Sequence, residues 1–208
     1  MTWLLLLILT GLYALILFWL HRRKRLFTTY LFGAFGLAFL IVQLSVLQNW
    51  HSSLQDMEAQ HIHTIMSVFN VDIQVINGQT LMVPDSTGWS GLSIGAECSS
   101  LLELAVFVGL MTFYPRLSLR RRWTSFAVGV AGIYALNLGR ILIIVMMVLL
   151  WGKPAVPFAH VIVARFFYFG GIVLIYWIFF TRPMLAIIRQ AINTQETQPS
   201  QQVAYAGE

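Results

Sequence analysis

The chain has 208 residues, of which 58% are hydrophobic and only 10% are charged, whereas a soluble domain carries roughly 25% charged residues. This composition excludes an ordinary soluble globular domain, because too few polar residues remain to cover a core in water, and it indicates lipid as the solvent. The single cysteine, Cys98, excludes an intramolecular disulfide.

Five segments with at most one charge each are long enough to cross a hydrocarbon core of about 30 Å. We therefore predict an all-α integral membrane protein with about five transmembrane helices. A basic cluster follows the first segment, whereas a cleavable signal peptide carries its positive charge before the apolar run, so a retained helix is expected. In chain order the segments are residues 1–20, 26–47, about 98–114, 123–151 and about 158–181.

The positions of the basic residues predict the orientation. All but three of them lie in three clusters: Arg22–Arg25, Arg116 with Arg120–Arg122, and Arg182 with Arg189. Alternating spans put all three clusters on one side of the membrane. The positive-inside rule identifies that side as the cytoplasmic side of the cell membrane. The clusters thus act as orientation signals, and the net charge of +5 needs no nucleic-acid partner.

This topology predicts an external N-terminus and a cytoplasmic C-terminus. Residues 1–189 are predicted to form a single multi-pass membrane domain, and residues 190–208, rich in Gln and Thr, a disordered cytoplasmic tail. An extracytoplasmic loop is expected over about residues 48–97, which contain no Lys or Arg.

The loop has three predicted elements. Residues 52–69 suit an amphipathic helix on the outer surface. Asn77-Gly78, between residues 71–76 and 79–83, is a strong signal for a short β-hairpin with a type I′ turn. Leu92 and Ile94 then alternate as in a short strand before the chain enters the third span.

Arg140 and Arg165 lie within predicted spans, where a charge costs at least about 2.5–3.5 kcal/mol and marks a functional candidate. Arg140 is about 25 Å along its helix from Trp123, close to the outer boundary of the hydrocarbon. Cys98 and His160 open the third and fifth spans from the same side. Three chemically active side chains from three helices are therefore expected at one depth.

The three side chains suit a thiol nucleophile. Cys98 is expected in the first turn of a helix, where the helix dipole and a nearby Arg favour the thiolate. His160 can act as general base and acid, and Arg140 can stabilise a thiolate or an oxyanion. Two simpler interpretations of these residues stay open. Cys98 could be a small packing residue, and Arg140 or Arg165 could form a salt bridge with Glu103.

Metal chemistry is not expected. His61 and His63 are two residues apart, so on a helix they point to different faces. The acidic residues of the loop lack the spacing of a calcium-binding loop, and no cofactor is predicted. These residues are Asp56, Glu58, Asp72 and Asp85.

Three motifs together resemble the exosortase/archaeosortase family of multi-pass membrane cysteine enzymes: Ala96-Glu97-Cys98-Ser99-Ser100, Asn137-Leu138-Gly139-Arg140, and His160 in an apolar span. The resemblance covers roughly residues 71–180 and is greatest to the short Gram-positive branch, exosortase G. It departs at Ser100, where the family commonly has glycine.

The resemblance implies a catalytic triad of Cys98, Arg140 and His160, with Arg165 as an alternative third member. Asn137, Glu97 and Arg165 are assigned to substrate binding. It also implies a membrane-embedded cysteine protease or transpeptidase that cleaves the C-terminal sorting tail of exported proteins at the outer face, through a thioester, and transfers them to a surface acceptor.

The expected partners are the exported substrate protein and the lipid bilayer. One alternative is a non-catalytic membrane scaffold for a glycosyltransferase or surface-polysaccharide export system. It predicts that Cys98 is dispensable. A second is a small transporter that binds an anion through Arg140 and Arg165, although no internal repeat is visible.

Overall fold

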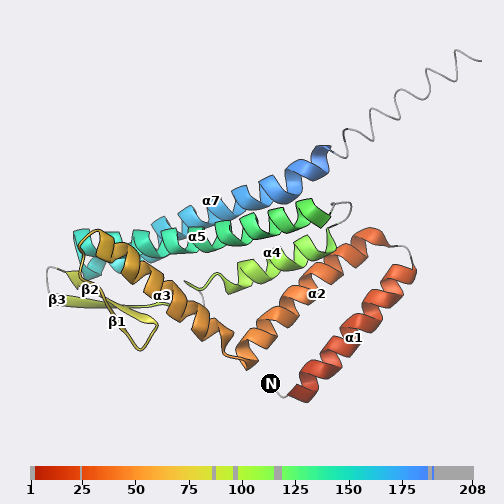
Figure 1. Ribbon diagram of the computed structural model, residues 1–208, viewed down its shortest axis with the longest axis horizontal. Coiled ribbons are helices and arrows are strands. Elements are labelled where there is room, and N and C mark those ends of the chain that lie inside the picture. The colour runs from red at the N-terminus through yellow and green to blue at the C-terminus, as the bar shows by residue number, and fades with distance from the viewer. Residues whose placement is uncertain are drawn as a thin grey trace, which may run out of the picture.

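The computed structural model describes residues 3–23, 25–85, 88–95, 98–114, 119–186 and 189, and these are mostly helical (Figure 1). Glu97 and the tail predicted to be disordered lie outside the described residues. The helices in chain order are α1 (Trp3–Arg22), α2 (Leu26–Leu47), α3 (Trp50–Val68), α4 (Leu101–Phe113), α5 (Leu119–Trp151), η2 (Lys153–Ala155), α6 (Val156–Phe158), η3 (Ala159–Val163), α7 (Ala164–Tyr176) and η4 (Trp177–Thr181).

Four helices in the described part of the chain are long and apolar enough to cross a membrane, which confirms the predicted class of fold. They are α1, α2, α5 and the continuous helix Lys153–Ala186 that contains α7. At the place of the third predicted span lies α4, a shorter apolar helix of 13 residues. At 1.5 Å per residue α4 covers only about 20 Å of the bilayer.

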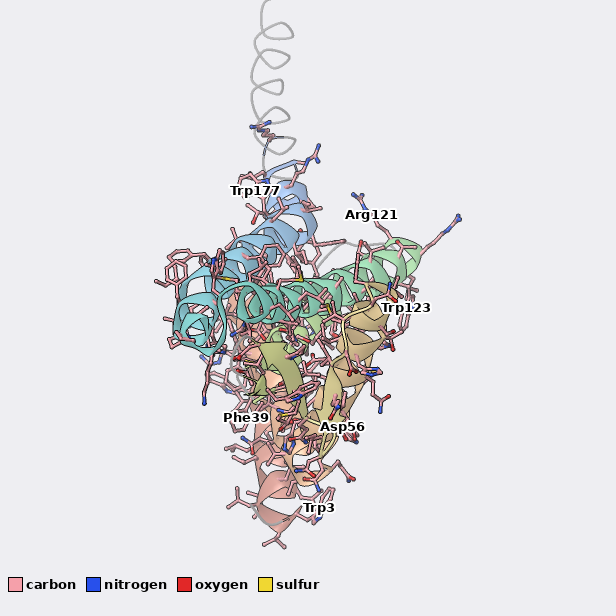
Figure 2. All side chains as sticks on the ribbon, turned by 90° about the vertical axis from the view of Figure 1, so that its left-hand side faces the viewer. Trp3, Phe39, Asp56, Arg121, Trp123 and Trp177 are labelled. Atoms are coloured by element: carbon pink, nitrogen blue, oxygen red, sulfur yellow. The ribbon has the colours of Figure 1, made fainter. Side chains whose placement is uncertain are left out.

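The elements form a row (Figure 1). α5 and α7 lie side by side, α4 lies between α5 and α2, and α1 is outermost. The connection from α1 to α2, the start of α5 and the end of α7 lie on one side, and the sheet and α3 lie toward the other. Figure 2 views the row from the left-hand side of Figure 1, with Trp177 and Arg121 toward the top and Trp3 at the bottom. The described basic clusters therefore share one side of the molecule.

The α1, α2 and α4 helices approach closely at small residues. A side chain at Gly109 of α4 would collide with the carbonyl of Ala34 in α2, and one at Gly36 with the ring of Tyr13 in α1. The Tyr13 hydroxyl donates a hydrogen bond of 2.7 Å to the Gly33 carbonyl. Close backbone approach at small residues is typical of helix packing in lipid.

α5 is longer than a bilayer requires. Its 33 residues extend about 50 Å, roughly 20 Å more than the hydrocarbon thickness. The C-terminal end of α5, which the predicted topology makes its outer end, packs against α3 and the sheet in one buried apolar cluster, here called the outer assembly. Its most buried members are Ala59, Ile62, Leu81, Val83, Val145 and Val148.

The sheet has three antiparallel strands, β1 (Gln74–Ile76), β2 (Thr80–Asp85) and β3 (Gly88–Ser93), in the order β1-β2-β3. Asn77 and Gly78 have positive φ values of 51° and 73°, as a type I′ turn requires. Ile76 pairs with Thr80, so the connection is one residue longer than the predicted two-residue turn. The short predicted strand is longer than expected and completes the sheet as β3, beyond the hairpin.

Candidate active site

Cys98 lies in the turn between the sheet and α4. Its amide donates a hydrogen bond of 2.9 Å to the Gly95 carbonyl, and its own carbonyl accepts one of 2.7 Å from the Asn137 side chain. α4 begins only at Leu101, so the prediction that Cys98 occupies the first helical turn was wrong by three residues. The bond from Asn137 ties this turn to α5.

The imidazole of His160 faces the thiol of Cys98. The distance from Cys98 Sγ to His160 Nε2 is 3.1 Å, which is within reach of direct proton transfer. His160 belongs to η3, a stretch of π-helix with one wider turn. Such turns interrupt the regular helical spacing and often occur at functional sites, because they reorient a side chain. The structure thus brings together two residues that are 62 positions apart in the chain.

Asn137 of α5 ties three segments together beneath this pair. Its amide nitrogen donates to the Cys98 carbonyl at 2.7 Å and to Glu58 Oε1 of α3 at 2.8 Å. The hydroxyl of Ser100 also reaches Glu58 Oε1, at 3.4 Å. Asn137, Glu58 and Ser100 are all fully buried. The network fixes the turn that carries the thiol relative to α3 and α5.

The sequence led us to consider Glu58 only as a loop carboxylate without calcium-binding spacing, and its place in this network was not predicted. Glu58 is fully buried, and its second oxygen has no hydrogen-bond partner among the described residues. Burial raises the pKa of this carboxyl to about 7, although hydrogen bonds from Asn137 and Ser100 and the charge of Arg140 act in the opposite direction. The available signal was its helical position, because Glu58 shares the buried face of α3 with Ile62 and Met66.

Arg140 is buried within the bundle and has only 6% of its surface exposed. It follows Asn137 by one helical turn, and its guanidinium carbon lies 5.4 Å from the centre of the Tyr168 ring, in the range of a cation–π contact. Arg140 and Glu103 line a cavity of about 260 Å³ together with Arg165. Arg165 is itself exposed, and it is not among the residues that line the cavity at Cys98 and His160.

A second cavity, of about 170 Å³, opens at the thiol and is called the thiol cavity below. It lies between β3, the outer end of α5 and the turn that leads into His160. Apolar side chains form most of its lining, and Cys98 and His160 provide the reactive groups. Its lining residues are Leu81, Gly91, Leu92, Ser93, Ile94, Cys98, Ile141, Ile144, Val156 and His160.

The described residues contain no group of three or more His, Cys, Asp or Glu side chains placed to hold a metal ion. His61 instead makes a 2.7 Å hydrogen bond from Nδ1 to the hydroxyl of Tyr134, which joins α3 to α5. The reactive groups at the thiol cavity are a thiol and an imidazole, and the guanidinium of Arg140 is buried one helical turn from Asn137.

The family comparison covers all of these elements. The family model described as "Transmembrane exosortase (Exosortase_EpsH)" matches residues 1–177. The chain belongs to the transmembrane exosortase family. No curated protein and no solved structure matches the chain.

The matched range includes every element that carries the candidate site of this exosortase: α3, the sheet, α4, α5 and α7 through Tyr176. The membrane character that the family implies agrees with the apolar helices. The resemblance that rested on three short motifs thus extends over most of the chain.

Proposed function

We propose that this exosortase is a cysteine transpeptidase that cleaves exported proteins beside a C-terminal membrane tail and transfers them to an acceptor. The observation that carries the proposal is the 3.1 Å contact between Cys98 Sγ and His160 Nε2 at a cavity beside the outer end of α5. A thiol within hydrogen-bond reach of an imidazole is the arrangement of an activated nucleophile.

In the first half-reaction His160 Nε2 takes the thiol proton and Cys98 Sγ forms a bond to the carbonyl carbon of the substrate. The electron pair of the carbonyl moves to its oxygen, for which Arg140 supplies positive charge. When this oxyanion collapses, the bond to the leaving amine breaks and the amine takes the proton from His160. A thioester between Cys98 and the exported protein remains.

In the second half-reaction an acceptor amine attacks the thioester carbonyl. The amine gives its proton to His160, the C–S bond breaks, and the thiolate of Cys98 takes the proton back. Asn137 keeps the Cys98 main chain in place through both steps, because its amide holds the Cys98 carbonyl.

We infer that the site faces the outside of the cell. The described basic residues of three connections lie on the side opposite the sheet, and the positive-inside rule assigns that side to the cytoplasm. The outer end of α5, where Cys98 and His160 meet, then lies near the outer boundary of the bilayer. A peptide bond just outside a substrate's membrane helix would lie at that depth.

Capture of the thioester tests the function. The chain is expressed in its native cells, purified in detergent, and treated with neutral hydroxylamine, which cleaves thioesters. We expect a released protein with a newly formed C-terminus from the wild type and none from Cys98→Ala at equal expression. Normal maturation of surface proteins in Cys98→Ala cells would overturn the enzyme and favour the scaffold alternative.

A further inference from the structure

β3 is an edge strand beside the reactive thiol. The sheet order β1-β2-β3 leaves one side of β3 without a partner strand among the described residues. A free edge presents main-chain N–H and C=O groups that pair readily with another extended chain. Here the free edge ends at Ser93, five residues before Cys98.

The register identifies which main-chain groups point outward. Ile94 donates a hydrogen bond of 2.8 Å to the Gln79 carbonyl, so Ile94 and Gln79 form a hydrogen-bonded pair of the β2–β3 ladder. Such pairs alternate along an antiparallel ladder. Leu92 therefore bonds to β2, whereas the main-chain groups of Ser93 and Gly91 face away from it. Among the described residues, nothing hydrogen-bonds to these outward groups.

Both β3 residues with outward main-chain groups line the thiol cavity. Gly91 and Ser93 are both exposed, and both line the cavity that contains Cys98 and His160. The cavity therefore has main-chain donors and acceptors along one wall and a nucleophile at its end. Apolar side chains of α5 and α6, Ile144 and Val156, supply the opposite lining.

We propose that the substrate of this exosortase binds as an added strand on the free edge of β3, where Gly91 and Ser93 pair with its main chain and direct a carbonyl carbon to Cys98. This inference rests on the proposed function and names the form in which the substrate binds, an extended peptide. Only another main chain repeats donors and acceptors at the spacing of a strand. Because main-chain pairing does not depend on the side chains of the peptide, any preference for a substrate sequence would come from side-chain contacts in the cavity.

Gly91 offers a matched pair of variants. A Cβ at this position would make ordinary contact with Met82 Sδ at 3.4 Å, so Gly91→Ala keeps the outward N–H without a clash. Gly91→Pro removes that N–H. Proline is tolerated where a strand residue does not bond to its neighbour, and β2 already has Pro84 opposite Trp89, at a position that does not hydrogen-bond across the pair.

The wild-type test uses acetyl-Ala-Ala-Ala chloromethyl ketone as probe. The thiolate of Cys98 displaces chloride and forms a thioether, and mass spectrometry reads the product without background because the chain has a single cysteine. Three analogues each carry one N-methylated amide. In an added strand alternate residues face the partner, so we expect methylation to lower the rate roughly 2- to 10-fold at one of two adjacent amides and not at the other.

Equal rates for all analogues would overturn strand addition. A different result, the absence of any captured thioester from cells, would contradict the proposed function. The two Gly91 variants give a second readout: the alternation should persist in Gly91→Ala and weaken in Gly91→Pro, while small iodoacetamide labels Cys98 equally in both. If iodoacetamide labelling is lost in Gly91→Pro, that variant has disturbed the site and the wild-type series alone decides.

A second copy of the chain is the rival occupant of this edge. It would be revealed by Ser93→Cys in a Cys98→Ala background, through an intermolecular disulfide formed on mild oxidation of dilute protein in detergent. We expect this variant to stay monomeric. A disulfide-linked dimer that forms in proportion to folded protein would assign the edge to self-association and overturn the proposal.

Discussion

The α1–α2 pair and the outer assembly of α3, the sheet and the end of α5 are packed by different means. α1 buries only Leu6 and Leu20, and α2 meets its neighbours at glycine and alanine. The outer assembly buries a large apolar cluster and, next to it, a polar network centred on Glu58 and Asn137. Lipid supplies no hydrophobic driving force between helices, so close contact dominates in the first region. We expect water to supply that force in the second, which the predicted topology places outside the bilayer.

The difference shows why the candidate site lies in the outer assembly, whose buried cluster includes Cys98. A buried polar network needs a scaffold that keeps each of its partners in place, because an unmatched buried group costs about 1–3 kcal/mol. The outer assembly supplies that scaffold, and α5 continues from it into the membrane. We expect substitutions in the outer network to change reactivity, and substitutions on the lipid-facing side of α1 to have little effect.

The largest effect is expected for His160→Ala. Without the base at 3.1 Å from the thiol, thioester formation should fall by about 10²- to 10⁴-fold. Quantified thioester capture measures the loss. His61→Ala is the control, since it removes a histidine that bonds to Tyr134 on the outer assembly but does not touch the thiol. Equal activity of both variants would show that the imidazole of His160 is not the base.

The second-largest effect is expected for Arg140→Lys. Thioester formation should fall by about 10²- to 10³-fold, the effect of removing one oxyanion donor. Lys keeps the charge but not the planar guanidinium that lies over the Tyr168 ring. Protein level and thioester yield are measured together. Reduced protein level with normal yield per molecule would instead assign Arg140 to a structural ion pair.

Asn137→Leu should lower both stability and thiol reactivity. It removes the side-chain donor of the Cys98 carbonyl and the shorter of the two hydrogen bonds to Glu58 Oε1, at a cost of about 1–3 kcal/mol. Thermal unfolding in detergent and the rate of iodoacetamide labelling report the two effects. Adding Glu58→Leu should recover part of the stability, because the unpaired carboxyl is then removed. Strictly additive losses would show that the two side chains do not cooperate.

Glu58→Gln should change the pH dependence of stability. The folded protein holds the Glu58 proton more tightly than the unfolded chain, since its pKa is raised from 4.5 to about 7. Its stabilising contribution is therefore complete below about pH 4.5 and is lost as the pH rises through about 7. Melting temperatures from pH 5 to 8 should fall less steeply in Glu58→Gln than in the wild type. Parallel curves would mean that Glu58 ionises normally.

The smallest effect is expected for Gly11→Ala in α1. An added Cβ at Gly11 meets nothing within 4 Å, whereas one at Gly109 meets the Ala34 carbonyl. Gly11→Ala should leave the melting temperature and thioester yield unchanged or slightly improved, because alanine favours the helix. Gly109→Ala should lower the melting temperature. Similar destabilisation by both would contradict the close packing of α2 on α4.

Several structural features were readable from the sequence because each depends on local pattern. The apolar segments, the amphipathic α3 and the positive φ values at Asn77 and Gly78 are properties of neighbouring residues. Cys98 and His160 were singled out by depth along two helices, and the structure places them in contact. Glu58 escaped detection because its partners, Asn137 and Ser100, are 79 and 42 positions away.

The sequence by itself determined the membrane class, the segments that become helices and the candidate reactive side chains, because hydropathy and charge act over a few turns of chain. Only the tertiary structure decided which of them meet. It turned His160 toward Cys98 at a π-helical turn, used Asn137 to hold the main chain of Cys98, and placed Arg165 at the cavity of Arg140 and Glu103. These outcomes depend on how α3, α4 and α5 pack, and no local pattern encodes that packing.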